Sequence, residues 1–98
     1  MSKFNLTILT PKGVVFDDQV VSIVAPGANG FFGVLANHAP MIAATTAGVL
    51  KVADGKDRYF AMGSGIVEVA QNNVNILADS AEAAESREAA KLKSNELD

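Results

Sequence analysis

Short apolar segments separated by turn residues recur along residues 3–79, and this feature constrains the fold more than any other. Turns that contain Asp-Gly, paired glycines or Asn are typical of hairpins, because these residues adopt a positive φ at little cost. Three such turns lie in the second half of the chain: Asp54-Gly55, Gly63-Ser64-Gly65 and Asn72-Asn73. The strands that they are expected to join as hairpins are residues 49–53, 58–62, 66–70 and 74–78. Short strands at regular intervals favour a β-sandwich or a barrel.

The N-terminal part of the chain also has the sequence pattern of β-strands. Phe4, Leu6 and Ile8 alternate with polar residues, which is the period of a strand with one face in water. Residues 11–13, Pro-Lys-Gly, predict a turn. Residues 19–25 are rich in β-branched side chains and predict one further strand, which ends at Pro26-Gly27.

The pattern changes at Asp79, after which helix-forming residues dominate. Residues 79–82, Asp-Ser-Ala-Glu, resemble a capping box. From Ser80 to Lys93 there is no Gly or Pro, which predicts a helix of about 21 Å with an alanine-rich face. We therefore expect a β-sandwich domain over residues 1–79 and a single C-terminal helix with its tail over residues 80–98.

Composition excludes several classes of function. The chain has 98 residues, enough for one domain, and 8 basic against 11 acidic residues give a net charge of −3 without a basic cluster. Nucleic-acid binding requires such a cluster to neutralise phosphates. The absence of cysteine excludes disulfides, thiolate zinc sites and cysteine nucleophiles. No apolar stretch approaches the roughly 20 residues that span a bilayer, and the first residues do not resemble a secretory signal. We expect a soluble chain.

The candidates for catalysis or metal binding favour structural interpretations. His38 is the only histidine, and no spacing in the sequence supplies the nucleophile or carboxylate that a catalytic histidine needs. We expect it to be a structural or interface residue. Asp17-Asp18 could form half of a metal site, but without a third oxygen ligand nearby a solvated turn is favoured. We predict no catalytic residue, no metal and no cofactor.

Residues 27–33 contain both a glycine pattern and two adjacent aromatic residues. Gly27, Gly30 and Gly33 are not followed by a helix, so tight backbone turns are favoured over phosphate binding. Phe31 and Phe32 must point to opposite faces of a strand, so at most one of them can face the core. The other is either exposed or covered by a partner protein.

An ordered series of motifs resembles the epsilon subunit family of the F-type ATP synthase, small rotor subunits of the central stalk. The series spans roughly residues 3–90 and is strong as a set although each motif alone is weak. Its members are Gly30-Phe31-Phe32-Gly33-Val34-Leu35, His38-Ala39-Pro40, Gly48-Val49-Leu50, Gly63-Ser64-Gly65-Ile66-Val67-Glu68-Val69, Val74 and Ile76-Leu77-Ala78-Asp79-Ser80-Ala81.

The resemblance implies a ten-stranded β-sandwich and a non-catalytic role in coupling c-ring rotation, driven by protons, to ATP synthesis. It implies contacts with the gamma subunit and the c-ring, indirect contact with the catalytic alpha and beta subunits, and a peripheral position on the cytoplasmic face of a bacterial inner membrane. By the same resemblance, His38 and Met41 are expected at the gamma interface. The residues expected at the c-ring are Gly30, Phe31, Phe32 and Gly33.

This chain also departs from the family pattern. Ala36 stands where proline is common, and Phe31 stands where an acidic or polar residue is common. The family has a hairpin of two helices after the sandwich, whereas this sequence ends at Asp98, after the first expected helix. The helix motif associated with ATP binding is matched only at Arg87, which weakens any expectation of ATP binding or of hairpin-type inhibition.

Two other functions remain open from the residues alone. The chain could be a free-standing β-sandwich module that binds a peptide or a carbohydrate, although it has no Trp and only one Tyr, Tyr59, for an aromatic platform. An enzyme with His38 as general base is the least favoured alternative.

Overall fold

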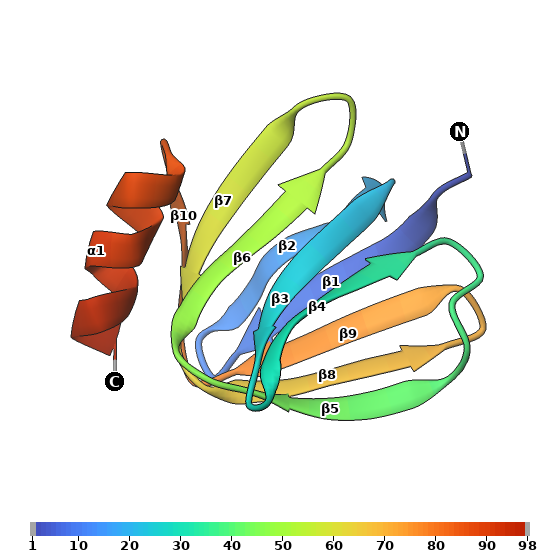
Figure 1. The fold of residues 1–98 in the computed structure, drawn as a ribbon, viewed down its shortest axis with the longest axis horizontal. Helices are drawn as coiled ribbons and strands as arrows, with labels where there is room; N and C mark the ends of the chain where they lie inside the picture. Colours follow the sequence, from blue (N-terminus) through green and yellow to red (C-terminus); the bar gives the residue numbers. More distant parts are fainter. Residues whose placement is uncertain (1, 98) are drawn as a thin grey trace.

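The computed structural model describes residues 2–97 and consists of ten β-strands and one helix (Figure 1). The fold class predicted from the sequence is therefore confirmed. The elements are β1 (Phe4–Thr10), β2 (Gly13–Val20), β3 (Ser22–Gly27), β4 (Gly30–Leu35), β5 (Met41–Thr45), β6 (Gly48–Ala53), β7 (Asp57–Met62), β8 (Gly65–Ala70), β9 (Asn73–Ala78), β10 (Ala81–Ala84) and α1 (Arg87–Leu97).

The strands form two layers that curl toward one another (Figure 1). One layer has the order β4-β3-β6-β7-β10 and the other the order β5-β8-β9-β1-β2. A single residue pair, Gly27 with Thr45, joins β3 to β5 and makes the two layers one continuous sheet. All pairings are antiparallel except that of β1 with β9, which brings the first strand against a strand near the end of the chain.

The core lies between the layers and follows the alternation seen in the sequence. Phe4, Leu6 and Ile8 are at most 1% exposed, because β1 lies inside its layer between β9 and β2. Leu50 and Ile76 are completely buried on the facing layers. Burial of such side chains supplies about 1.5–3 kcal/mol each, which makes this core the main source of stability.

Two of the expected hairpins are confirmed and one is corrected. Gly55 has a φ of 81° in the turn between β6 and β7, as Asp-Gly predicts. The β8–β9 hairpin is also present, but its turn lies one residue earlier than predicted: it consists of Gln71 and Asn72, with φ of 51° and 61°, and Asn73 begins β9. The segment at Gly63-Ser64 is no hairpin, because β7 and β8 belong to different layers and the chain crosses between them there.

The strand predicted over residues 19–25 is also corrected. β2 ends at Val20 and β3 begins at Ser22, so the β-branched run contains a change of partner at Val21. The backbone N–H of Val21 donates to the carbonyl of Ala53 on β6, 2.8 Å away, which starts the pairing of β3 with β6. Composition does not reveal this change, because both halves of the run favour extended backbone.

The helix predicted to begin at Ser80 begins at Arg87 instead. Residues 81–84 form β10, which pairs antiparallel with the edge of β7 and satisfies its backbone groups there. The capping residue is Ser86, whose Oγ accepts a hydrogen bond from Ala89 N–H at 3.1 Å. The hydrogen bonds that the edge of β7 offers therefore outweigh the helix propensity of Ala and Glu in residues 81–84.

The division of the chain into a sandwich domain, residues 1–79, and a helix with its tail, residues 80–98, stays a prediction. Asp98 lies outside the described residues.

Helix α1 covers part of the outer face of the β6–β7–β10 layer (Figure 1). Ala90 is completely buried against Val49 and Ala61, with Tyr59 and Ala84 at the border. The small alanine side chain lets the helix approach the sheet closely, as expected. The remaining part of this outer face, over β3 and β4, is left uncovered.

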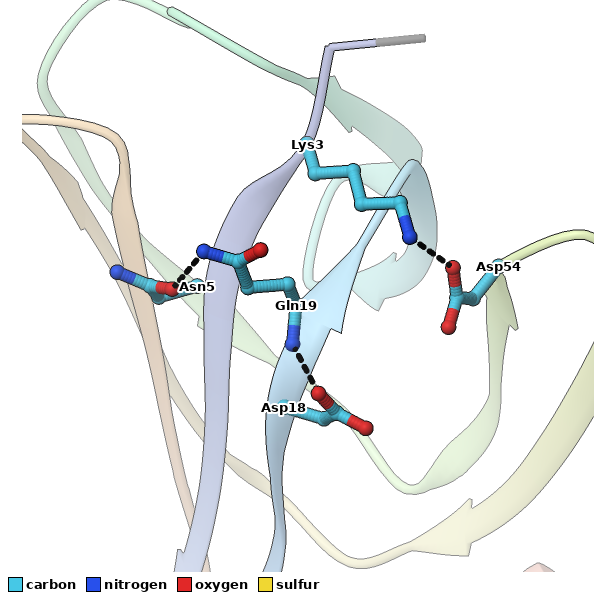
Figure 2. Close-up of polar contacts among 5 residues, drawn as sticks. All are labelled: Lys3, Asn5, Asp18, Gln19 and Asp54. Carbon is cyan, nitrogen blue, oxygen red and sulfur yellow. Dashed lines mark hydrogen bonds and ion pairs between the residues drawn. The ribbon is translucent and has the colours of Figure 1, made fainter.

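Of the polar contacts near the start of β1, one ties the two layers together (Figure 2). Lys3 Nζ lies 3.2 Å from Asp54 Oδ1, which joins the start of β1 to the β6–β7 turn. Within the β1–β2 pair, Gln19 Nε2 donates to Asn5 Oδ1 at 3.2 Å (Figure 2). Both contacts are at the surface, so each contributes at most about 1 kcal/mol.

Candidate partner-docking surfaces

A broad concave surface lies on the outer face of β5, β8 and β9. Its volume is about 560 Å³, and we call it the β5–β9 groove. The groove is lined by Pro40, Met41, Ile42, Glu68, Val69, Ala70, Asn73 and Asn75. It lies on three adjacent paired strands, so its floor is rigid.

Apolar side chains point outward around this groove. Ile42 is 74% exposed and stands in register with Glu68, which in turn pairs with Asn75. In the next outward row, Ile66 and Leu77 are 44% and 41% exposed. Three exposed apolar side chains on one sheet face, with a polar border, are typical of a surface that another protein covers.

Asn72 positions the loop that borders the groove. Its Oδ1 accepts a hydrogen bond from Asn37 N–H at 2.8 Å, and its Nδ2 donates to the Lys3 carbonyl at 2.9 Å. Its own carbonyl accepts from Asn5 N–H at 3.1 Å. One side chain thus connects the β4–β5 loop, the β8–β9 turn and the N-terminal strand. Because this turn also adopts positive φ, an Asn fits there better than most residues.

His38 and Met41 lie in and after this loop but differ in role. His38 is half-buried, and its Nδ1 lies 2.7 Å from the Ala39 carbonyl, a geometry suited to an Nδ1–H donor. Among the described residues, His38 has no hydrogen bond or ion pair with a carboxylate or hydroxyl group. Met41 lines the groove and also packs against the core.

The β3–β4 hairpin carries the four other predicted interface residues. Gly30 has a φ of 122° and opens β4 directly after the two-residue turn, as the glycine pattern predicts for a tight turn. Phe32 packs against the core, whereas Phe31 is 67% exposed, so the expected opposite orientation is confirmed. Gly33 is exposed on β4.

The structure does not bring the hairpin and the His38 loop together. They lie at opposite ends of β4, whose six residues span roughly 17–20 Å. A partner that contacts both must therefore be large, or two partners bind at separate places. Met41 belongs to the β5–β9 groove, whereas Phe31 faces a different part of the surface, beside Arg87 of α1.

Sequence reasoning missed Ile42 and Asn72. The apolar side chain of Ile42 is typical of a core residue, and only its pairing opposite Glu68 places it on the outer face of the sheet. Asn72 was recognised as a turn residue, but its bonds to distant segments depend on tertiary structure. No local signal distinguishes Ile42, because its neighbours Met41 and Ala43 are apolar as well.

The acidic pair Asp17-Asp18 forms no metal site in the described residues, and helix α1 is not a membrane span. Asp17 and Asp18 lie within strand β2 and not in a turn, and Asp18 Oδ1 accepts from Gln19 N–H at 2.7 Å (Figure 2). Within residues 2–97, no three His, Cys, Asp or Glu side chains gather closely enough to hold a metal ion. Helix α1, the helix of this same range, lacks the length and apolarity needed to cross a membrane.

The sequence model of one family, described as the ATP synthase delta/epsilon chain β-sandwich domain, matches residues 3–84 of the chain. This chain belongs to that family. An ATP synthase epsilon chain of Leptospira borgpetersenii is 40% identical over 78 residues, which cover 79% of this chain and 61% of that relative. One of Desulfitobacterium hafniense is 42% identical and covers 84% of this chain and 63% of its own length. The chain thus spans about three fifths of these relatives.

Solved structures share the fold of this family member. A chain from the mitochondrial ATP synthase of Euglena gracilis superposes with a TM-score of 0.80 at 23% identity, over 85% of this chain and 54% of that one. A chain from the central stalk and c-ring of the Tetrahymena thermophila enzyme gives a TM-score of 0.71 at 17% identity, over 83% and 66% of the two chains. At these identities the likeness establishes the architecture.

Proposed function

We propose that this chain is a non-catalytic rotor subunit in the central stalk of a proton-translocating F-type ATP synthase. In this role it docks on the gamma subunit and on the c-ring, and couples c-ring rotation to ATP synthesis in the alpha and beta subunits. It acts on the cytoplasmic face of a bacterial inner membrane and is held there through the complex. Family membership supports this role, and so do the rigid sandwich and its uncovered apolar groove.

The observation that carries the proposal is the exposure of Ile42 in the β5–β9 groove. A partner that covers this side chain removes apolar surface from water, which favours association by about 1–2 kcal/mol. Met41 lies beside it, and His38 borders the same region through the loop held by Asn72. We therefore assign this side to the gamma subunit.

The second contact is assigned to the β3–β4 hairpin, residues Gly30, Phe31, Phe32 and Gly33. The exposed Phe31 and the tight turn present an apolar side chain at one end of the sandwich, away from the His38 loop. We propose that this end meets the c-ring. A carbohydrate-binding module is less well supported, because no aromatic ring lines the β5–β9 groove in the described residues.

Titration of the full chain with purified gamma subunit, followed by native mass spectrometry, tests the proposal. We expect a one-to-one complex that Ile42→Asp weakens by about tenfold or more, since an anchor side chain dominates such interfaces. Leu35→Asp is the matched control, because Leu35 is 64% exposed on the other layer, outside the groove. Absence of a complex with the unmodified chain, or equal weakening by both variants, would contradict the assignment.

A further inference from the structure

A second groove lies between helix α1 and the β3–β4 hairpin, on the outer face of the other layer. Two adjoining hollows of about 370 and 190 Å³ share Phe31, Val49 and Arg87 and form one continuous surface, which we call the α1 groove. Phe31 forms one wall and α1 the other, with Val24 and Val49 between them. This groove is separate from the surface assigned to the gamma subunit, but it shares Phe31 with the hairpin assigned to the c-ring, so its occupant would compete with the c-ring for that side chain.

The charge of the α1 groove is opposite to that of the whole chain. Arg87, Lys91 and Lys51 are three of the 8 basic residues, and all three line the groove. None of the acidic residues described by the structure does so. Because the chain as a whole carries −3, the groove is a local concentration of positive charge on an acidic protein.

Arg87 is held in place by an aromatic ring, and both cations of α1 remain available to a partner. Arg87 stacks over the Tyr59 ring, with its guanidinium carbon 5.2 Å from the ring centroid. Across residues 2–97, neither Arg87 nor Lys91 has a carboxylate within ion-pair distance, whereas Lys51 pairs with Asp57 at 3.6 Å. Two cations on the helix wall therefore lack an anionic partner within residues 2–97.

The spacing of these cations indicates the shape of the occupant. Arg87 and Lys91 are four residues apart on α1, so they lie about 6 Å apart along its axis. A helix lying alongside α1 presents carboxylates at the same interval from Glu residues four apart. The groove walls are side chains and not a strand edge, so an extended peptide would leave its backbone unpaired there, whereas a helix satisfies its own.

We propose that the α1 groove binds an acidic amphipathic helix of a partner protein. The apolar stripe of that helix packs against Phe31, Val24 and Val49, and its flanking carboxylates pair with Arg87 and Lys91. This arrangement is the helix-in-groove mode of recognition, in which apolar anchors supply affinity and charges set orientation.

A fluorescein-labelled synthetic helix tests this proposal with the full chain. The probe has roughly four turns, Leu on one face and Glu on both flanks, and fluorescence anisotropy measures its binding. We expect binding that weakens as salt rises toward about 0.5 M, since partly exposed ion pairs are screened. A control helix with Lys in place of each Glu should not bind.

The double variant Arg87→Glu/Lys91→Glu should reduce affinity for the acidic probe by about tenfold or more, as reversal of close charge pairs does. Both positions are exposed, and Arg87 lies in the first turn of α1, where Glu is favoured, so the fold should persist, as circular dichroism can verify. Lys12→Glu/Lys56→Glu makes the same change of charge outside the groove and should leave affinity unchanged. Lys91→Gln gives a milder loss should the double variant not fold.

Several results would overturn the proposal. Absence of binding at a probe concentration of roughly 1 mM would do so, because the dissociation constant would then exceed that of even a weak specific complex. An equal loss of affinity in the two double variants would show that binding depends on the net charge of the chain and not on the groove. Complete competition by inorganic phosphate would indicate a simple anion site, and a dimer of the chain that Arg87→Glu/Lys91→Glu dissociates would indicate a second copy as the occupant.

Discussion

Replacing Gly65 by alanine tests how closely β8 and β9 approach each other at the start of β8. A Cβ on Gly65 would lie 2.8 Å from Ala78 Cα and closer still to the Leu77 carbonyl oxygen. Real Cβ atoms essentially never approach other atoms within 3.0 Å. Both neighbours are backbone atoms of a paired strand, which cannot rotate away as a side chain can. The pairing of β8 with β9 must therefore shift.

We expect Gly65→Ala to lower the free energy of unfolding by about 2 kcal/mol, in the upper part of the net range, because both clashing atoms belong to the backbone. Overpacking of this kind costs about 1–3 kcal/mol, and the smaller entropy of the unfolded alanine chain offsets about 0.4–1 kcal/mol of that cost. Gly65 does not adopt a positive φ, so backbone strain adds nothing. In a domain of this size, the loss corresponds to a midpoint of thermal unfolding roughly 8–16 °C lower.

Gly33→Ala is the matched control. Its Cβ would meet only the Ile23 carbonyl oxygen, at 3.7 Å, an ordinary contact, and Gly33 also lacks a positive φ. We expect it to leave stability unchanged or to raise it by up to about 1 kcal/mol. Thermal unfolding of both variants, followed by circular dichroism, makes the comparison. Midpoints within roughly 2 °C of each other would refute the steric argument.

Two further substitutions test local contacts. Asn72→Ala removes the hydrogen bonds to Asn37 N–H and to the Lys3 carbonyl, and should lower the free energy of unfolding by about 1–2 kcal/mol in urea titrations. An unchanged midpoint would mean that the β4–β5 loop is held by other contacts. Ser86→Ala removes the cap on Ala89 N–H and should cost about 1 kcal/mol, with partial loss of the helical circular-dichroism signal. Full helicity in this variant would show that packing of α1 on the sheet suffices.

The core strands were predictable because their signal is local. Phe4, Leu6 and Ile8 alternate with polar residues, and a strand with one buried face produces that alternation whatever its neighbours are. The Asp54-Gly55 turn was predictable for a similar reason, since the required positive φ restricts the residue types that fit. Among the interface candidates, the opposite orientation of Phe31 and Phe32 also followed from local geometry alone.

The errors share one cause, which is competition from a distant segment. Residues 81–84 favour helix by themselves, but the free edge of β7 offers them hydrogen bonds as β10. Residues 63–64 resemble a hairpin turn, yet the chain crosses there to the other layer. The candidate surfaces depend on similar long-range pairing. Ile42 lies outside because β5 pairs with β8 in one register, and a shift by one residue would bury it.

A mainly β fold, the inward-facing residues of the first strand and the positions of several turns follow from the amino-acid sequence alone. Those properties follow from the side-chain period and from φ preferences, both of which act over a few residues. Only the tertiary structure decided which strands share a layer, where α1 begins, and which charges line the α1 groove. Lys51 and Arg87 lie far apart in the chain, and they reach one groove because α1 packs across β6.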